Sequence, residues 1–184
     1  SLPAVTLDGQ EITLMANVDV PTEVQVALDY GARGVGMYRT EFLYLNYRLP
    51  SEEEQLKVYS AIVEAMAPRP VVIRTLDLGG DKLSHVLEAT PEANPFLGWR
   101  GIRICLDTPD LFKTQLRALL RAGLHGEVQI LLPMVSSLHE LWQARALLDE
   151  AKDELRQKGL AFADCKLGIM VEVPSVALMT DQFA

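Results

Sequence analysis

The chain has 184 residues, a balanced composition and a formal net charge of −8. This length is enough for one hydrophobic core of ordinary size, but it is short for a complete eight-stranded α/β barrel, which usually needs about 250 residues. The acidic balance argues against a nucleic-acid-binding protein, which normally presents a basic face. It does not exclude small anionic ligands, because a few arginines can form a local positive site in an acidic protein.

Cysteine usage and hydropathy indicate the cellular setting of the protein. Cys105 and Cys165 lie far apart in the sequence and lack the spacing of a metal site. We interpret them as buried thiols of a reducing compartment rather than as a disulfide. No apolar run approaches the roughly 18 residues of a membrane span, and the first residues lack the charged start and apolar core of a signal peptide. We therefore expect a cytoplasmic protein that does not insert into membranes.

Strand-like and helix-like segments alternate along the chain. In chain order, the predicted elements are a strand at 12–17, a helix at 19–31, a strand at 34–38, a helix at 51–66, strands at 71–76 and 102–106, a helix at 109–123, a strand at 128–135, a helix at 136–159, a strand at 167–173 and a helix from 174 onward. Several strand candidates are nearly continuous in valine, isoleucine, leucine and methionine, which is typical of parallel strands buried on both faces.

Two of the predicted helices begin with a recognisable signal. Ser51 and Glu54 have the spacing of a capping box, in which the two side chains satisfy free N–H groups at the start of a helix. Ser137 and Glu140 repeat this spacing at the start of the helix at 136–159. A glycine, Gly159, marks the end of that helix.

The order of elements predicts an α/β fold, because repeated βα units form a parallel sheet wrapped by helices. Spacings of roughly 25–40 residues between strands fit either a barrel or a doubly wound sheet. The glycine-rich stretch GARGVG precedes its strand instead of following it, so it is not a phosphate loop. Since the chain contains no linker or low-complexity segment, residues 1–184 are predicted to form one domain.

Charged residues accompany three of the predicted strands. Arg39 and Glu41 follow the second strand, and Arg74 and Asp77 close the third. Glu172 lies in the last strand, within the stretch GIMVEVPS. Ligands of α/β folds bind at the carboxyl ends of the strands, so these side chains would converge on one rim if the sheet closes.

These charges allow a structural and a functional interpretation. Arg39 could form an ion pair with Glu41 or Asp77. Glu172 is harder to explain in this way, because its apolar neighbours would bury it and a buried carboxylate needs a partner or a metal. Guanidinium groups suit carboxylates and phosphates, and a carboxylate at a strand end suits Mg²⁺. The combination suggests a small phosphate ester held by arginines and bridged to Mg²⁺.

The histidines do not suggest a nucleophilic centre. His85, His125 and His139 are predicted in a loop, a turn and a helix, and we interpret all three as incidental. Only His85 falls near the proposed rim. Nucleophilic catalysis within this chain is therefore not expected.

Four stretches, GVGMYRTEFLYL, IRTLDLGGDK, NPFLGWRGIRICLD and GIMVEVPSVAL, closely resemble the phosphoenolpyruvate-binding domain of the Enzyme I family of the bacterial sugar phosphotransferase system. The resemblance covers essentially the whole chain in colinear order. It implies a (β/α)8 TIM barrel whose rim binds phosphoenolpyruvate and Mg²⁺, present here as about six of eight βα units. It also implies a homodimeric phosphoenolpyruvate–protein phosphotransferase, which passes the phosphoryl group to a histidine on a separate domain and on to the carrier protein HPr.

The resemblance assigns roles to individual residues. Arg39 and Arg74 should hold the phosphate and carboxylate of phosphoenolpyruvate. Arg100, in the stretch GWR, should be a third arginine of that site, although the strand-end rule alone does not place it there. Glu172 should be a Mg²⁺ ligand. Beside these roles, we predict that Asp77 orients Arg74.

Parts of the family pattern do not occur in this chain. They are a GTNDL-like motif with the second metal carboxylate, a cysteine that protonates the enolate, and the phosphorylated histidine of the partner domain. We therefore expect no catalytic residue and no turnover in the chain alone, and unpaired sheet edges at its first and sixth strands.

Three other interpretations stay open. The first is a fragment of pyruvate phosphate dikinase or phosphoenolpyruvate synthase. The second is a Mg²⁺-dependent aldolase or lyase, although three arginines are more phosphate-binding charge than such a site needs. The third is a non-catalytic domain that senses phosphoenolpyruvate or serves oligomerisation.

Overall fold

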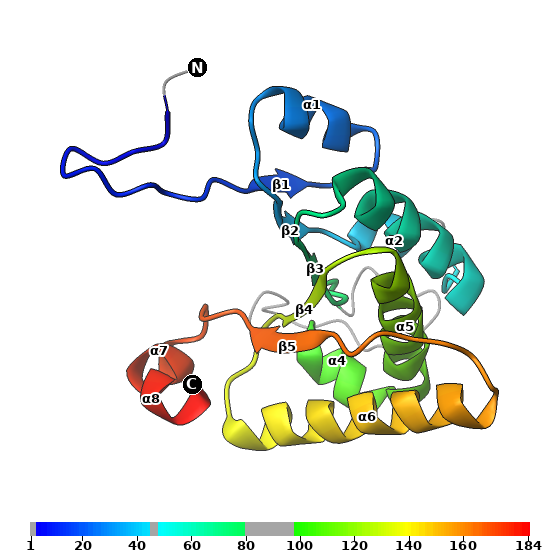
Figure 1. The fold of residues 1–184 in the computed structure, drawn as a ribbon. Coiled ribbons are helices and arrows are strands. Elements are labelled where there is room, and N and C mark those ends of the chain that lie inside the picture. The colour runs from blue at the N-terminus through cyan, green and yellow to red at the C-terminus, as the bar shows by residue number, and fades with distance from the viewer. Residues whose placement is uncertain (1–2, 45–47, 80–97) are drawn as a thin grey trace.

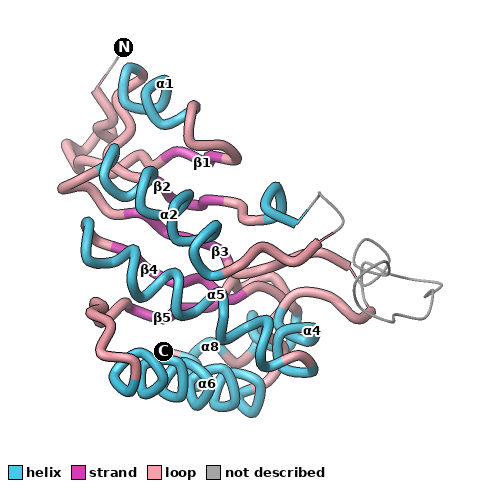
Figure 2. The backbone as a smooth tube through the Cα atoms, turned by 90° about the vertical axis from the view of Figure 1, so that its right-hand side faces the viewer, coloured by secondary structure: helices cyan, strands magenta, loops and turns pink. Residues whose placement is uncertain are grey.

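The computed structural model describes residues 3–44, 48–79 and 98–184. Its centre is a parallel sheet with the strand order β1-β2-β3-β4-β5. The strands are β1 (Ala16–Val18), β2 (Val35–Tyr38), β3 (Val71–Arg74), β4 (Val128–Leu132) and β5 (Lys166–Ile169). They follow one another through the molecule in chain order (Figure 2). The predicted α/β class, with its parallel sheet, is confirmed.

Helices connect the strands and cover the sheet. They are α1 (Glu23–Asp29), α2 (Glu52–Met66), α4 (Ile102–Asp107), α5 (Pro109–Ala122), α6 (Leu138–Gln157), α7 (Pro174–Leu178) and α8 (Thr180–Phe183), with short 3₁₀ turns η1 (Glu41–Tyr44) and η2 (Gly123–His125). Helix α5 packs between α2 and α6 on one side of the sheet (Figure 1). In the part of the chain that the structure describes, no helix combines the length and the apolar character needed to cross a membrane.

The strands consist mainly of branched apolar residues. β3 reads VVIR and β4 reads VQILL, and alternate residues of both strands are buried. Their pairing runs in register from Val71 opposite Val128 to Arg74 opposite Leu131. Because neighbouring parallel strands run in the same direction, their carboxyl ends meet at one edge of the sheet. That edge carries the charged residues singled out above.

Both predicted capping boxes are present. Ser51 caps α2 and accepts a hydrogen bond from the backbone N–H of Glu54, whose side chain accepts in return from the N–H of Ser51. Ser137 and Glu140 make the same reciprocal contacts at the start of α6. A serine-to-alanine change at such a position typically costs about 1 kcal/mol, so these local signals stabilise the two longest helices that the structure describes.

The strand predicted at 102–106 is wrong, because these residues belong to helix α4. Ile102, Ile104 and Cys105 are fully buried, so the apolar run reflects a buried helix rather than a buried strand. Periodicity cannot separate these two cases over so few residues. The described residues therefore contain five strands of one sheet in place of the six predicted.

The other five strands are all shorter than predicted. The strand predicted at 34–38 begins at Val35, and the strand predicted at 71–76 ends at Arg74. The first strand was predicted at 12–17 and occupies Ala16–Val18, and the strand predicted at 128–135 ends at Leu132. The last was predicted at 167–173 but ends at Ile169. Glu172 therefore follows its strand and does not lie within it.

Candidate functional site

The first two arginines occupy neighbouring strand ends. Arg39 directly follows β2, and Arg74 is the last residue of β3. The hydroxyl of Thr40 donates a hydrogen bond of 3.1 Å to the carbonyl oxygen of Arg74. This contact ties the two strand exits together at the carboxyl edge of the sheet.

Arg39 is the most exposed of the three arginines. Its Nη1 lies 3.1 Å and 3.2 Å from the two carboxylate oxygens of Asp19, a residue that follows β1. The side chain of Arg39 is 43% exposed. Among the described residues its carboxylate partner is thus Asp19, and neither Glu41 nor Asp77 takes the role considered from the sequence.

Arg74 lies between two carboxylates and is nearly buried. Its Nη2 is 2.6 Å from Oε1 of Glu41, and its Nη1 is 2.9 Å from Oδ2 of Asp77. The other oxygen of Asp77 accepts from Arg100, at 2.9 Å from Nη2 and 3.1 Å from Nε. Asp77, with a side chain only 4% exposed, therefore joins two of the three predicted arginines. If Asp77 orients Arg74, as we predict from the sequence, the two side chains must be in contact, and this ion pair provides that contact.

Backbone geometry brings Arg100 to the same edge. Residue 100 forms an isolated antiparallel bridge with Gly79, shortly after β3. Gly101, with φ +56°, follows it in a conformation that residues with a side chain rarely adopt. A Cβ at Gly101 would lie 3.0 Å from Cγ of Met134 and 3.2 Å from Oδ1 of Asp77. Glycine is therefore required for this close approach.

Glu172 is exposed, so the prediction that its apolar neighbours bury it is wrong. Its Oε1 accepts a hydrogen bond of 2.7 Å from the backbone N–H of Met134. Met134 follows β4, and its side chain lies next to Gly101. Met134 thus links Glu172 to Gly101, the residue that follows Arg100.

The donor set for a metal is small. Over residues 3–44, 48–79 and 98–184 there is no group of three or more histidine, cysteine, aspartate or glutamate side chains that could hold a metal ion. Mg²⁺ usually takes only one or two protein carboxylates and completes its shell with water and substrate oxygens. An exposed carboxylate oriented by a backbone N–H, as Glu172 is, fits the part of one such ligand.

Two polar atoms of the site lack a partner within the described chain. They are Nε of Arg74 and Oε2 of Glu41, and both are buried. Both atoms belong to the Arg74–Glu41 ion pair, which therefore leaves one donor and one acceptor unsatisfied. A buried N–H without an acceptor is costly.

The pKa of Tyr38 is affected by its burial and by carboxylates next to the site. This residue ends β2 and is buried beside Arg39. Burial, with smaller contributions from Asp19 and Glu41, raises the pKa of Tyr38 to about 12. Its hydroxyl is therefore neutral at physiological pH.

His125, His139 and the two cysteines do not join the site. His85 lies outside the described residues. His125 pairs with Glu64 at 2.6 Å, in the turn that precedes β4, and His139 is exposed on α6. Cys105 and Cys165 are buried and not bonded to each other, as predicted. Burial raises the pKa of the Cys165 thiol to about 11, and burial together with Asp77 raises the pKa of Cys105 well above its usual range.

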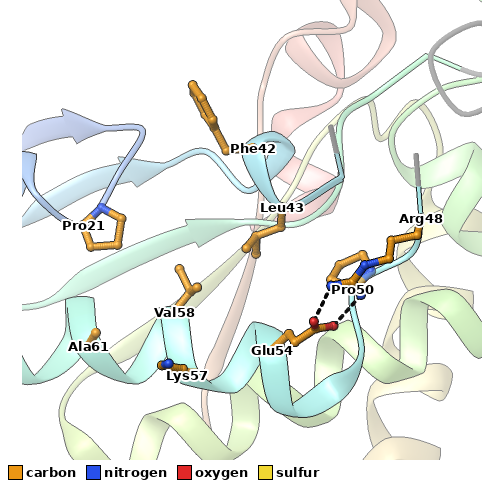
Figure 3. Close-up of a pocket in the computed structure, with 9 residues that line it drawn as sticks. All are labelled: Pro21, Phe42, Leu43, Arg48, Pro50, Glu54, Lys57, Val58 and Ala61. Atoms are coloured by element: carbon orange, nitrogen blue, oxygen red, sulfur yellow. Dashed lines mark hydrogen bonds and ion pairs between the residues drawn. The ribbon is translucent and has the colours of Figure 1, made fainter. Parts of the chain in front are cut away.

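A separate hollow of about 490 Å³ lies between η1 and α2. Phe42, Leu43 and Val58 give it a mainly apolar lining (Figure 3). Arg48, at its rim, is already paired with Glu54. Because none of the three site arginines lines it, we do not assign the anion to this hollow.

Sequence reasoning missed the buried polar residues behind the arginines. Gln115 lies on α5 and hydrogen-bonds to the backbone of Leu76 and to Thr40. Its position could have drawn notice, because it shares the apolar helix face of Phe112 and Leu119 at the usual spacing of three or four residues.

Comparisons with known proteins identify the family of this chain. Residues 1–184 match the family described as PEP-utilising enzyme, PEP-binding domain. Proteins named phosphoenolpyruvate-protein phosphotransferase are 50% identical in Geobacillus stearothermophilus, 49% in Staphylococcus carnosus and 46% in Bacillus subtilis. Each match covers 98–99% of this chain but only 32% of the relative, so the chain spans about a third of their length. The chain therefore belongs to the phosphoenolpyruvate-binding domain family of the phosphoenolpyruvate-utilising enzymes.

Proposed function

We propose that this chain is the phosphoenolpyruvate- and Mg²⁺-binding part of a phosphoenolpyruvate–protein phosphotransferase. The observation that carries the proposal is the junction of Arg74 and Arg100 through one buried carboxylate, Asp77, at the carboxyl edge of a parallel sheet. Ligands of α/β folds bind at that edge. The names of the relatives favour this activity over the dikinase, aldolase and sensor alternatives.

In this proposal the arginines bind and neutralise the substrate. Arg39 and Arg74 hold the phosphate and carboxylate of phosphoenolpyruvate, and Arg100 adds a third guanidinium. Guanidinium forks match both anionic groups in geometry. Phosphoryl transfer needs mainly positioning and charge neutralisation from the protein, so this chain's part in catalysis is to hold the donor.

We further propose that Glu172 contributes one ligand to Mg²⁺. The metal, when bound, neutralises charge on the phosphate and on the enolate oxygen that remains after transfer. The hydrogen bond from Met134 holds the carboxylate in place, and the exposure of Glu172 leaves it accessible to the ion.

The remaining parts of the proposal concern the longer protein. The five strands would belong to a (β/α)8 barrel, the accepting histidine would lie on another domain, and HPr would take the phosphoryl group from it. The protein would be a cytoplasmic homodimer that serves sugar uptake. These proposals rest on the family and on relatives about three times the length of this chain.

Substitution of the two joined arginines tests the proposed site. In the full-length protein that carries this chain, we expect Arg74→Met and Arg100→Met to weaken phosphoenolpyruvate binding by roughly tenfold or more, because each removes charge-assisted hydrogen bonds. Isothermal titration calorimetry with Mg²⁺ measures this affinity. Arg33→Met, which removes an exposed arginine before β2, should leave it unchanged.

Two outcomes would contradict the proposal. Wild-type affinity in both site variants would remove the arginines from the site. Pyruvate release by the 184-residue chain alone would refute the view that transfer needs groups outside it.

A further inference from the structure

A single buried glutamine contacts both strand exits that carry the first two arginines. Gln115 lies on α5 and is fully buried. Its Oε1 accepts a hydrogen bond of 3.0 Å from the backbone N–H of Leu76, and its Nε2 donates to Oγ1 of Thr40 at 3.4 Å. One side chain thus links segments that lie 39 and 75 residues away in the sequence.

The contacted residues flank the site. Leu76 stands between Arg74 and Asp77, and Thr40 directly follows Arg39. Thr40 in turn donates its hydroxyl to the carbonyl oxygen of Arg74. Movement of the Gln115 side-chain amide would therefore move both strand exits. The amide is hydrogen-bonded to the backbone of Leu76 after β3 and to the buried hydroxyl of Thr40 after β2.

Helix α2 fixes the orientation of this amide. Nε2 of Gln115 also donates to the hydroxyl of Tyr59 at 3.1 Å, and that hydroxyl donates to Oε1 of Gln55 at 3.0 Å. Gln55 is anchored by its own bond of 3.1 Å to the carbonyl oxygen of Pro50. Burial raises the pKa of Tyr59 far above its usual range, so the hydroxyl remains a neutral donor and acceptor.

These contacts leave little freedom to the amide. A glutamine offers one carbonyl acceptor and one NH₂ donor group, and both groups of Gln115 are engaged. An apolar residue of similar size would fill the same space, but it would leave the N–H of Leu76 buried without an acceptor. Since a buried N–H rarely stays unpaired, the β3 exit would shift to satisfy it.

We propose that Gln115 is a positioning residue for the anion site, which holds the exits of β2 and β3 so that Arg39 and Arg74 face the same ligand. Gln115 does not itself touch the substrate. The inference rests on the proposed function and adds to it a control point on α5, behind the sheet edge.

Steady-state kinetics of Gln115→Met in the full-length protein test this role. We expect the KM for phosphoenolpyruvate to rise roughly tenfold or more while kcat changes little. In this proposal the arginines hold the substrate in the ground and transition states alike, and the loss of such interactions appears in KM with kcat unchanged. A purely structural defect would instead reduce the amount of folded enzyme, and so lower the apparent kcat without changing KM.

Two further variants help to distinguish a positioning role of Gln115 from a purely structural one. Leu116→Ala removes a fully buried neighbour on the same helix, so it should lower the thermal midpoint and leave KM unchanged. Tyr59→Phe removes one partner of the Gln115 amide but keeps the Leu76 contact, and should raise KM by a smaller factor. If Gln115→Met does not fold, Tyr59→Phe decides the test.

Hydrogen exchange separates this inference from the proposed function. In Gln115→Met, mass spectrometry should show faster amide exchange in the peptide that contains Leu76, and unchanged exchange there would overturn the inference. An unchanged KM in both Arg74→Met and Arg100→Met would defeat the proposed function, and the inference with it. A raised KM in Arg74→Met combined with an unchanged KM in both Gln115→Met and Tyr59→Phe would overturn the positioning role alone.

Discussion

Asp77 is the residue on which the site depends most. It is a nearly buried carboxylate whose two oxygens are both engaged by guanidinium groups, from Arg74 and Arg100. A buried charge is tolerated only when its partners compensate for lost hydration. The three groups therefore form one unit, and removing the central carboxylate takes from Arg74 and Arg100 the partner that they share.

We expect Asp77→Ala to lower the free energy of unfolding by about 3–5 kcal/mol, the usual cost of breaking a buried ion pair. It should also weaken phosphoenolpyruvate binding, because Arg74 and Arg100 lose the group that orients them. Urea unfolding and calorimetry measure the two effects. Asp153→Ala, which removes an exposed carboxylate paired with Arg156 on the surface, should change both by little. Unchanged substrate affinity in Asp77→Ala would refute the orienting role.

Three helices are tied together by ion pairs on the outside of the fold. Arg117 on α5 donates to Glu52 of α2 at 2.7 Å and to Glu154 of α6 at 2.6 Å. Arg121 adds a second contact to Glu52 at 2.6 Å. Because α5 also supplies Gln115, this network helps to hold the helix that contacts both strand exits.

The pH dependence of stability should reveal this network. Burial alone would raise the pKa of Glu52, but the hydrogen bonds from Arg117 and Arg121 outweigh it and lower the pKa below its ordinary value of 4.5. A carboxyl whose pKa is lowered on folding stabilises the fold above its ordinary pKa, and the contribution is lost as the pH falls through the lowered value. Glu52→Gln should therefore be less stable than wild type at pH 7, by roughly 1–2 kcal/mol, and equal to it in strong acid.

Urea unfolding across this pH range measures the difference. Glu150→Gln is the matched control, because Glu150 is an exposed carboxylate of α6 that pairs with Lys113 at 3.3 Å. It should differ little from wild type at any pH. A Glu52→Gln deficit that persists undiminished in strong acid would show that the loss has another cause.

Sequence reasoning succeeded where structure depends on local signals. The capping boxes at Ser51 and Ser137 were predictable because serine and glutamate act within one helical turn. The positions of Arg39 and Arg74 at the ends of strands were predictable, because polar residues that follow an apolar run mark the end of a strand. In both cases the relevant interaction or boundary involves residues a few positions apart.

Reasoning failed where structure depends on distant residues. The apolar run that forms α4 is too short for the spacing of its apolar residues to distinguish a helix from a strand. The exposure of Glu172 depends on which elements cover the end of β5, and apolar neighbours in sequence do not determine that. The contacts of Gln115 join residues up to 75 positions apart, a separation at which no local pattern operates.

At the scale of the whole molecule, the described sheet has two edges, β1 and β5 (Figure 2). An edge strand offers unpaired backbone groups to another chain. The residues of β5 are only partly buried or exposed, whereas alternate residues of β4 are buried. Apolar side chains that follow β5 in the sequence are exposed as well, with Val171 57% and Leu178 86% exposed.

We expect the 184-residue chain, expressed alone, to self-associate through the β5 edge and the exposed side chains that follow it as its concentration rises. Exposed apolar patches beside an open edge favour association, although the net charge of −8 opposes it at low ionic strength. Sedimentation velocity over a wide range of concentration measures the effect. Leu178→Lys should shift the distribution toward monomer, whereas Trp142→Lys, which replaces a 60% exposed residue on α6, should not. A chain that stays monomeric throughout, or an equal effect of both variants, would mean that the β5 edge and these side chains do not drive association.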